Sequence, residues 1–340
     1  MMSDAATTVN PSETAHGRVS VPVIDISGFE GPERQEISDR IGEASREIGF
    51  FVITGHGVSA DLVDRVGRAT RAFYDLPFDV KSQYSSARRG YFGKGRQAVA
   101  QSMDGKKTVP DDHEIFAMGR DAIDSSDPYF KTPRAEQVFS PNIWPDVLPE
   151  FRRAWLEYYD AIEALAKRLM AIFEEALSLP EGWFWPRFDK HMSTMAAINY
   201  PAQEAPPVEG QTRLGGHTDF GAFTVLKAED KPGGLEVQNR HGVWETVPVV
   251  PNSFIVNVGD MLKRWTNDVW ESSLHRVGNP PTGSGAAARR QSLVFFAHPN
   301  YDVTIEPLPG RDLGEPKYPP ISAGELLVSR IDKMRATKAN

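Results

Sequence analysis

Two histidines and an aspartate have the residue types and spacing of a metal site. His217 and Asp219 are separated by one residue, so on an extended segment their side chains would face the same side. His275 lies in a later segment that favours a strand, and it could supply a third ligand. Two imidazoles and one carboxylate suit iron(II) with open positions for a chelating co-substrate and dioxygen, and they also suit zinc. A His-x-Asp triplet also arises by chance, which leaves open that these are ordinary residues.

Arg290 and Ser292 form a second polar pair, at the start of an apolar run that continues from Leu293 to Ala297. The run has the composition of a buried strand, on which Arg290 and Ser292 share one face. A buried guanidinium needs an anion, and with a hydroxyl beside it the pair suits the two oxygens of a carboxylate. That carboxylate could belong to a small-molecule ligand or to an internal Asp or Glu.

The elements that must position these residues lie in the half of the chain where the hydrophobic period is two. Residues 195–301 contain short β-forming runs separated by Gly, Pro and Asn turns, a pattern typical of a β-sandwich or jelly roll. Strands are also predicted at Val21 to Ile26 and Phe50 to Thr54, and a long helix at Leu148 to Leu177 should cover the back of a sheet. The pattern is weak between Ser82 and Asp146, which indicates lid or binding loops.

A chain of 340 residues could form one large domain with extensions or two domains, since domains average about 150 residues. The helices gather in the first half and the strands in the second, which favours one interdependent domain. We therefore expect a disordered tail at 1–20 and a single domain at 21–340. Its parts are an N-terminal helix, strand and lid region at 21–145, a backing helix at 146–194, a jelly-roll core with the metal site at 195–302 and a C-terminal segment at 303–340.

The composition excludes several classes of function. The formal net charge of −8 argues against nucleic acid and against an anionic membrane surface as partners. The chain has no cysteine, so thiol nucleophiles, iron–sulfur clusters and zinc ribbons are excluded, and any metal must be bound by His, Asp or Glu. Met1 to Ser20 lacks the apolar run of a signal peptide. We expect a cytoplasmic protein with a small-molecule partner, and nothing in the sequence indicates its oligomeric state.

Nine blocks in order along the chain resemble the isopenicillin N synthase-like family of non-haem Fe(II)/2-oxoglutarate-dependent oxygenases. An ordered set of this kind is far more specific than any one motif. The blocks are Val21-Pro-Val-Ile-Asp25, Gly49-Phe-Phe-Val-Ile-Thr-Gly-His-Gly57, Phe73-Tyr-Asp-Leu-Pro77, Asn199-Tyr-Pro201, His217-Thr-Asp219, Gly233-Gly-Leu-Glu-Val237, Asn257-Val-Gly-Asp260, His275-Arg-Val277 and Arg290-Gln-Ser292.

The resemblance implies a mainly β fold with flanking helices, built on a distorted double-stranded β-helix of the jelly-roll, cupin-like type. It implies Fe(II) held by His217, Asp219 and His275, and 2-oxoglutarate held by the residues Arg290, Ser292 and Tyr200. The implied reaction uses dioxygen to oxidise an unactivated C–H bond of a small molecule and decarboxylates 2-oxoglutarate to succinate and CO2. Hydroxylation is the default outcome, with desaturation, cyclisation or epoxidation as variants, and ascorbate is the expected reductant in vitro.

The resemblance also implies that Tyr91, Phe116 and Phe296 line the substrate pocket, although core or lid packing would explain each of them equally well. The basic loop from Arg88 to Arg96 could attract an anionic substrate or be an ordinary solvated loop. Three other functions remain open from the sequence: an Fe(II) oxidase that does not use 2-oxoglutarate, a metal-dependent hydrolase, and a binding module without activity.

Overall fold

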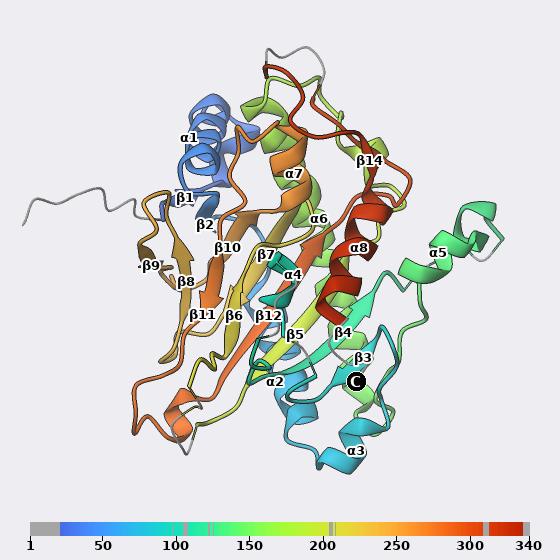
Figure 1. Ribbon diagram of the computed structural model, residues 1–340, viewed down its shortest axis with the longest axis vertical. Coiled ribbons are helices and arrows are strands. Elements are labelled where there is room, and N and C mark those ends of the chain that lie inside the picture. Colours follow the sequence, from blue (N-terminus) through green and yellow to red (C-terminus); the bar gives the residue numbers. More distant parts are fainter. Residues whose placement is uncertain are drawn as a thin grey trace, which may run out of the picture.

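The computed structural model describes residues 21–335 apart from 97, 105–107, 122, 125, 204–206, 208 and 309–312. The tail expected at residues 1–20 lies outside this range. Within it, two facing β-sheets form the centre of the molecule and helices cover one of them (Figure 1). The prediction of a mainly β core with flanking helices is confirmed.

The larger sheet has eight strands in the order β1-β2-β10-β7-β12-β5-β4-β3. β1 and β2 are parallel, and every other neighbouring pair in this sheet is antiparallel. The strands are β1 (Val23–Asp25), β2 (Phe50–Thr54), β3 (Gly90–Phe92), β4 (Glu114–Gly119), β5 (Thr194–Tyr200), β7 (Phe223–Ala228), β10 (Phe254–Val258) and β12 (Arg290–Ala297).

The smaller sheet has four antiparallel strands in the order β6-β11-β8-β9. It lies at the left of Figure 1, in front of the larger sheet. Its strands are β6 (Leu214–His217), β8 (Leu235–Gln238), β9 (Trp244–Thr246) and β11 (His275–Val277), and a separate hairpin pairs β13 (Thr304–Ile305) with β14 (Ile321–Ser322).

Alternation along the strands divides the interior into two cores, because successive side chains of a strand point to opposite faces. On β12, Leu293 and Phe295 pack toward the helices, whereas Val294 packs toward the smaller sheet with Phe296 beside it. The other central strands divide in the same way. The inner face of β12, which also carries Arg290 and Ser292, therefore points into the space between the two sheets.

Three long helices bury the outer face of the larger sheet: α1 (Arg34–Glu47), α2 (Ala60–Tyr74) and α6 (Pro149–Ala176). α6 carries the continuous apolar stripe that predicts an amphipathic helix, and its Phe173 ring packs against Phe51 and Phe223 of the sheet. The helix predicted at Leu148 to Leu177 is thus confirmed, with each end within one residue of its predicted position. Its role is to hold the sheet rigid behind the inner face.

The remaining helices are short or lie at the edges of the sheets. They are α3 (Phe78–Ser82), α4 (Gln101–Asp104), α5 (Pro133–Val138), α7 (Asp260–Trp265) and α8 (Ala323–Arg335). α8 packs against α4 in front of the larger sheet, on the side away from α6 (Figure 1). Among the described residues, no helix is both long enough and apolar enough to cross a membrane.

The region between Ser82 and Asp146 is more regular than its pattern predicts. β3 and β4 lie in it and extend the larger sheet beyond β5. Phe116 of β4 is fully buried and its ring contacts Phe73 and Trp155. Tyr91 of β3 is also buried, and its hydroxyl donates a hydrogen bond to Glu114. Both side chains therefore belong to the packed interior, where their partners come from distant segments.

We predict that Phe116→Ala lowers the free energy of unfolding by about 3–5 kcal/mol, because truncation leaves a cavity among rings that cannot close it. Urea denaturation measures the change. The matched control is Phe78→Ala, since Phe78 is 67% exposed and its removal should change stability by less than about 0.5 kcal/mol. Equal effects of the two substitutions would contradict the placement of Phe116 in the core.

Candidate active site

The pairing of β6 with β11 brings two histidines together. His217 ends β6, His275 begins β11, and the two residues lie directly opposite each other in the antiparallel register. Their ring centroids are 4.3 Å apart. Both side chains are buried, and Phe50 of the larger sheet packs edge-on against His275. The histidines that are distant in sequence are thus neighbours because of strand pairing.

Backbone carbonyls determine the tautomer of both rings. The Nδ1 atom of His217 lies 2.9 Å from the Gly215 carbonyl oxygen, and that of His275 lies 3.0 Å from the Ser273 carbonyl oxygen. A carbonyl can only accept, so each Nδ1 must carry the hydrogen. The Nε2 atom of each neutral ring then presents a lone pair, which is the form of histidine that binds a metal. Burial, together with the neighbouring His275, lowers the pKa of His217 to about 4, so its ring is neutral near pH 7.

Asp219 directs one carboxylate oxygen at these lone pairs. Its Oδ1 lies 3.7 Å from the Nε2 atoms of both His217 and His275. Its Oδ2 accepts hydrogen bonds from Thr224 Oγ1 at 2.5 Å and Asn257 Nδ2 at 2.7 Å. Burial raises the pKa of Asp219, but the two histidines and the two hydrogen bonds outweigh it and keep the pKa below its usual value. The carboxylate is therefore ionised.

The donor atoms of the three residues all lie within 4.8 Å of one another. Two imidazole nitrogens and one carboxylate oxygen converge on one point while both histidines keep a hydrogen-bonded second nitrogen. This donor set fits a divalent metal that keeps open positions, such as iron(II) or zinc. The three residues singled out by their spacing are thus brought together by the fold.

Arg290 lies in the interior between the two sheets with most of its hydrogen-bonding capacity unused. The residue has no exposed surface, and its Nε donates to the Glu229 carbonyl oxygen at 3.3 Å. Both terminal nitrogens, Nη1 and Nη2, are buried without a hydrogen-bond partner in the described part of the chain. The alternative of an internal salt bridge to Arg290 is therefore not observed there. A buried guanidinium in this state fits an anionic ligand, because unpaired buried charge is costly.

Tyr200 and Ser292 lie next to Arg290 in the sheet. Tyr200 is opposite Arg290 in the β5–β12 register, and the Arg290 Cζ atom lies 5.2 Å from the centre of its ring. Burial raises the pKa of Tyr200 to about 12, so its hydroxyl stays protonated and can donate a hydrogen bond. Ser292 is buried two residues further along the same face. The three predicted co-substrate residues are thus adjacent.

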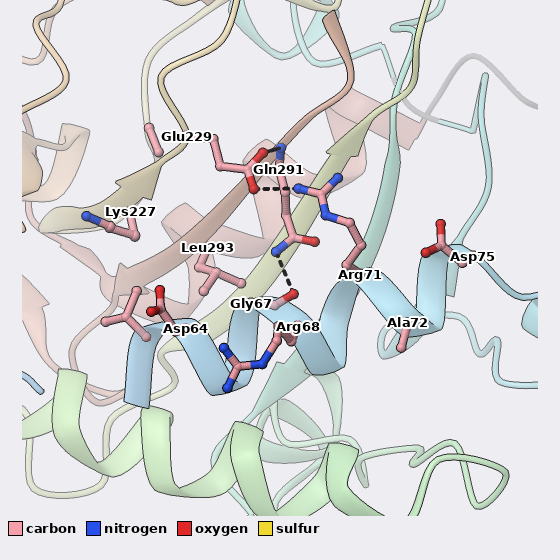
Figure 2. Close-up of a pocket in the computed structure, with 12 residues that line it drawn as sticks. Asp64, Gly67, Arg68, Arg71, Ala72, Asp75, Lys227, Glu229, Gln291 and Leu293 are labelled. Atoms are coloured by element: carbon pink, nitrogen blue, oxygen red, sulfur yellow. Dashed lines mark hydrogen bonds and ion pairs between the residues drawn. The ribbon is translucent and has the colours of Figure 1, made fainter. Parts of the chain in front are cut away.

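A cluster on the outer face of the sheet holds the strand that carries Arg290. A hollow of about 620 Å³ lies between α2 and the strands β7 and β12, and Figure 2 shows side chains that line it. There Glu229 accepts a hydrogen bond from the Gln291 backbone N–H at 2.8 Å and pairs with Arg71 of α2. The Gln291 side chain donates to the Gly67 carbonyl oxygen at 3.3 Å. These bonds join α2 to the start of β12 and restrain the position of Arg290.

A cavity of about 740 Å³ opens beside the histidine and aspartate cluster. His217, Asp219, Phe296 and His298 are among the residues that line it. Tyr91 and Phe116, expected from the resemblance to contact substrate, are not among its lining residues, because their side chains point into the core. Phe296 is the member of that group whose position fits a substrate contact.

Thr224 and Asn257 complete the site, although the sequence reasoning did not single them out. Each is a buried polar residue within a strand whose other members are mainly apolar. A polar residue at such a position needs a partner, and that requirement is the signal that could have identified them. Both hold Asp219 so that its other oxygen remains free.

Two family models match the chain. The model described as non-haem dioxygenase in morphine synthesis N-terminal matches residues 21–147, and the model described as 2OG-Fe(II) oxygenase superfamily matches residues 192–299. The second match contains the three clustered residues and Arg290. The first contains β1 to β4 and two of the covering helices, α1 and α2.

Curated and solved proteins are similar over nearly the whole chain. A 2-oxoglutarate-Fe(II) type oxidoreductase, hxnY, of Emericella nidulans is 32% identical over 90% of this chain and 88% of its own length. Validamycin A dioxygenase of Streptomyces hygroscopicus is 30% identical over 93% of this chain and 87% of its own. The crystal structure of Neurospora crassa T7H with alpha-KG has a TM-score of 0.79 and 28% identity, covering 92% of this chain and 95% of that one.

We predict that Thr224→Val weakens divalent metal binding about tenfold, because the isosteric change removes a hydrogen bond that orients Asp219. Calorimetric titration of the metal-free protein with Fe(II) under anaerobic conditions measures this. Thr246→Val on the exposed face of β9 is the matched control and should leave the affinity unchanged. Unchanged affinity in Thr224→Val would refute the orienting role.

Proposed function

The chain belongs to the 2OG-Fe(II) oxygenase superfamily and is an Fe(II)- and 2-oxoglutarate-dependent dioxygenase, and we propose the residues that carry this activity and the kind of substrate it takes. His217, Asp219 and His275 hold the iron. Arg290, Ser292 and Tyr200 hold 2-oxoglutarate. The observation that carries the assignment is the convergence of the three donor atoms within 4.8 Å of one another, beside a cavity that His217 and Asp219 line.

The charges of these groups balance those of the two ligands. Neutral His217 and His275 with an ionised Asp219 would leave an iron(II) site with a net charge of about +1. A dianionic co-substrate that binds there brings one carboxylate to the metal and leaves its far carboxylate to be neutralised elsewhere. Arg290 supplies that positive charge, and its two unpartnered terminal nitrogens match the two oxygens of a carboxylate.

Tyr200 and Ser292 add neutral donors beside this guanidinium. The raised pKa of Tyr200 keeps its hydroxyl protonated. The hydroxyl can therefore donate a hydrogen bond to an anion, and it adds no negative charge beside Arg290. Glu229 and Arg71 on the outer face hold the strand in place, so the guanidinium loses little freedom when the co-substrate binds. The co-substrate site is therefore organised before its ligand arrives.

Iron(II) with bound 2-oxoglutarate and dioxygen supplies an oxidant for unactivated C–H bonds and releases succinate and CO2. The protein's part is to position the substrate and to keep water away. Phe220 and Phe296 are apolar rings that line the cavity with His217 and Asp219. Hydroxylation of the substrate carbon is the outcome we propose.

The substrate is a small molecule. A cavity of about 740 Å³ has the volume of sites for such ligands. The relatives are consistent with this class: one is named for validamycin A, and Neurospora crassa T7H was solved with thymine.

The assignment is tested by measuring succinate from protein given Fe(II), ascorbate, 2-oxoglutarate and dioxygen. We expect slow succinate formation without added substrate, which is lost when iron is chelated and lost in Asp219→Ala, because that change removes an iron ligand. Iron binding without binding or consumption of 2-oxoglutarate would indicate the oxidase that does not use it. Activity with zinc in the absence of dioxygen would indicate a hydrolase. Retained turnover in Asp219→Ala would contradict the metal site.

We predict that Arg290→Met raises the KM for 2-oxoglutarate about a hundredfold or more, because the far carboxylate would then be buried without a counter-charge. Iron affinity should change little, since Arg290 is not a metal ligand, and titration with Fe(II) checks this. Arg152→Met is the control, because Arg152 is exposed and pairs with Asp121 on the surface. An unchanged KM in Arg290→Met would remove Arg290 from the co-substrate site.

A further inference from the structure

The walls of the cavity beside the metal site carry an excess of positive charge. Arg88, Arg89 and Arg96 line it, and Asp219 is the one acidic residue among the described residues of its lining. Once Asp219 is committed to a metal, none of these described residues offers a carboxylate to balance the arginines. This contrasts with the formal charge of the whole chain, which is −8.

Arg89 is the most deeply placed of the three. It is 8% exposed and forms no ion pair with any described residue. Its Nη2 donates to the Val138 carbonyl oxygen at 2.8 Å and its Nη1 to the Arg88 carbonyl oxygen at 3.3 Å. Nε is buried without a hydrogen-bond partner in the described structure. Burial lowers the pKa of Arg89 to about 10, so the side chain is still a cation near pH 7.

A second residue on the wall of this cavity also has an unpartnered polar atom. The Nδ1 of His298 is buried with no hydrogen-bond partner among the residues described. Buried polar atoms are normally satisfied, so the unpartnered Nε of Arg89 and Nδ1 of His298 on the wall of one cavity indicate a place for a polar ligand.

Gly119 makes room for this guanidinium. A Cβ atom at position 119 would lie 2.5 Å from Nη2 and 2.9 Å from both Cζ and Nε of Arg89. Any larger residue at position 119 would therefore displace the guanidinium group of Arg89. A substitution of Gly119 thus moves this cation and keeps its charge.

The Arg89 site is separate from the one proposed for 2-oxoglutarate. Gly119 and Phe296 both pair with Thr194 at one end of β5, whereas Arg290 pairs with Tyr200 at the other end. These strand positions are six residues apart, or about 20 Å. One small carboxylate cannot satisfy both arginines, so Arg89 would need an anion of its own.

We propose that the substrate is a small organic acid whose carboxylate is bound by Arg89. Its apolar body occupies the part of the cavity lined by Phe92, Val99, Phe220 and Phe296. Arg88 and Arg96, which are less buried, attract the anion toward this site. This inference rests on the proposed function, because it specifies the substrate class of the same active site.

The test uses anaerobic protein loaded with Fe(II) and saturating 2-oxoglutarate, so that the co-substrate site is filled and no turnover occurs. The probes are matched pairs of an acid and its primary amide: phenylacetate, 3-phenylpropanoate, 4-phenylbutanoate, hexanoate and octanoate. Ligand-observed NMR identifies binders and calorimetry measures their affinities. We expect acids among the binders, each bound about tenfold or more tighter than its amide, as a charge-assisted hydrogen bond would require.

Four variants test whether Arg89 is responsible for this preference. Arg89→Gln should abolish it, and Arg89→Lys should retain part of it. Gly119→Ala should weaken it by displacing the guanidinium while the charge is kept. Arg65→Gln is the control, because Arg65 is exposed on α2 and pairs with Glu157. Thermal melting shows which variants are folded. If Arg89→Gln does not fold, the affinities of Gly119→Ala and Arg89→Lys decide whether Arg89 binds the acid.

Each outcome separates this inference from the proposed function. If no acid binds, or if acids and amides bind equally, or if the preference persists in Arg89→Gln, the inference is overturned. Succinate formation without any preference for acids would leave the dioxygenase assignment intact and remove the substrate class. Preference for acids that persists in Arg290→Met would show that the anion is bound away from the co-substrate site and would support the inference.

Discussion

The site depends on one buried carboxylate, that of Asp219, held between two imidazoles. An ionised carboxylate in the interior is unstable unless it is paired and hydrogen-bonded. Here Thr224 and Asn257 hold one oxygen, and the other faces His217 and His275 at 3.7 Å. The free oxygen and the two lone pairs then have one arrangement that satisfies all of them, which is coordination of a common cation.

The two sheets together fix the positions of these groups. The smaller sheet places the histidines opposite each other through the β6–β11 register. The larger sheet supplies Thr224 from β7 and Asn257 from β10, strands that are themselves neighbours. α6 packs along the outer face and keeps this sheet from deforming. Ligands and their supporting residues thus come from four strands and from the turn after β6.

Buried arginines show how the same side chain can serve structure or ligand binding. Arg213 is fully buried, and its terminal nitrogens donate to the carbonyl oxygens of Pro201, Pro232 and Ala288, so it joins three loops of the backbone. The terminal nitrogens of Arg290 have no such acceptors in the described chain. Their difference lies in the surrounding carbonyl groups rather than in burial, and it leaves both terminal nitrogens of Arg290 available to a carboxylate.

The sequence by itself was sufficient to identify the class of the protein, because ordered blocks such as His217-Thr-Asp219 and Arg290-Gln-Ser292 are short local motifs. Such motifs can be recognised without knowledge of the fold. Period-two and helical patterns likewise predicted β2, β12 and α6, since these follow from alternation and amphipathicity within one segment. Tertiary structure decided the rest. β3 and β4 are strands because β5 is available to pair with them, Phe116 is a core residue because Phe73 and Trp155 surround it, and Arg89 is a buried cation because Gly119 leaves it room. Each depends on contacts between distant segments, which no local pattern encodes.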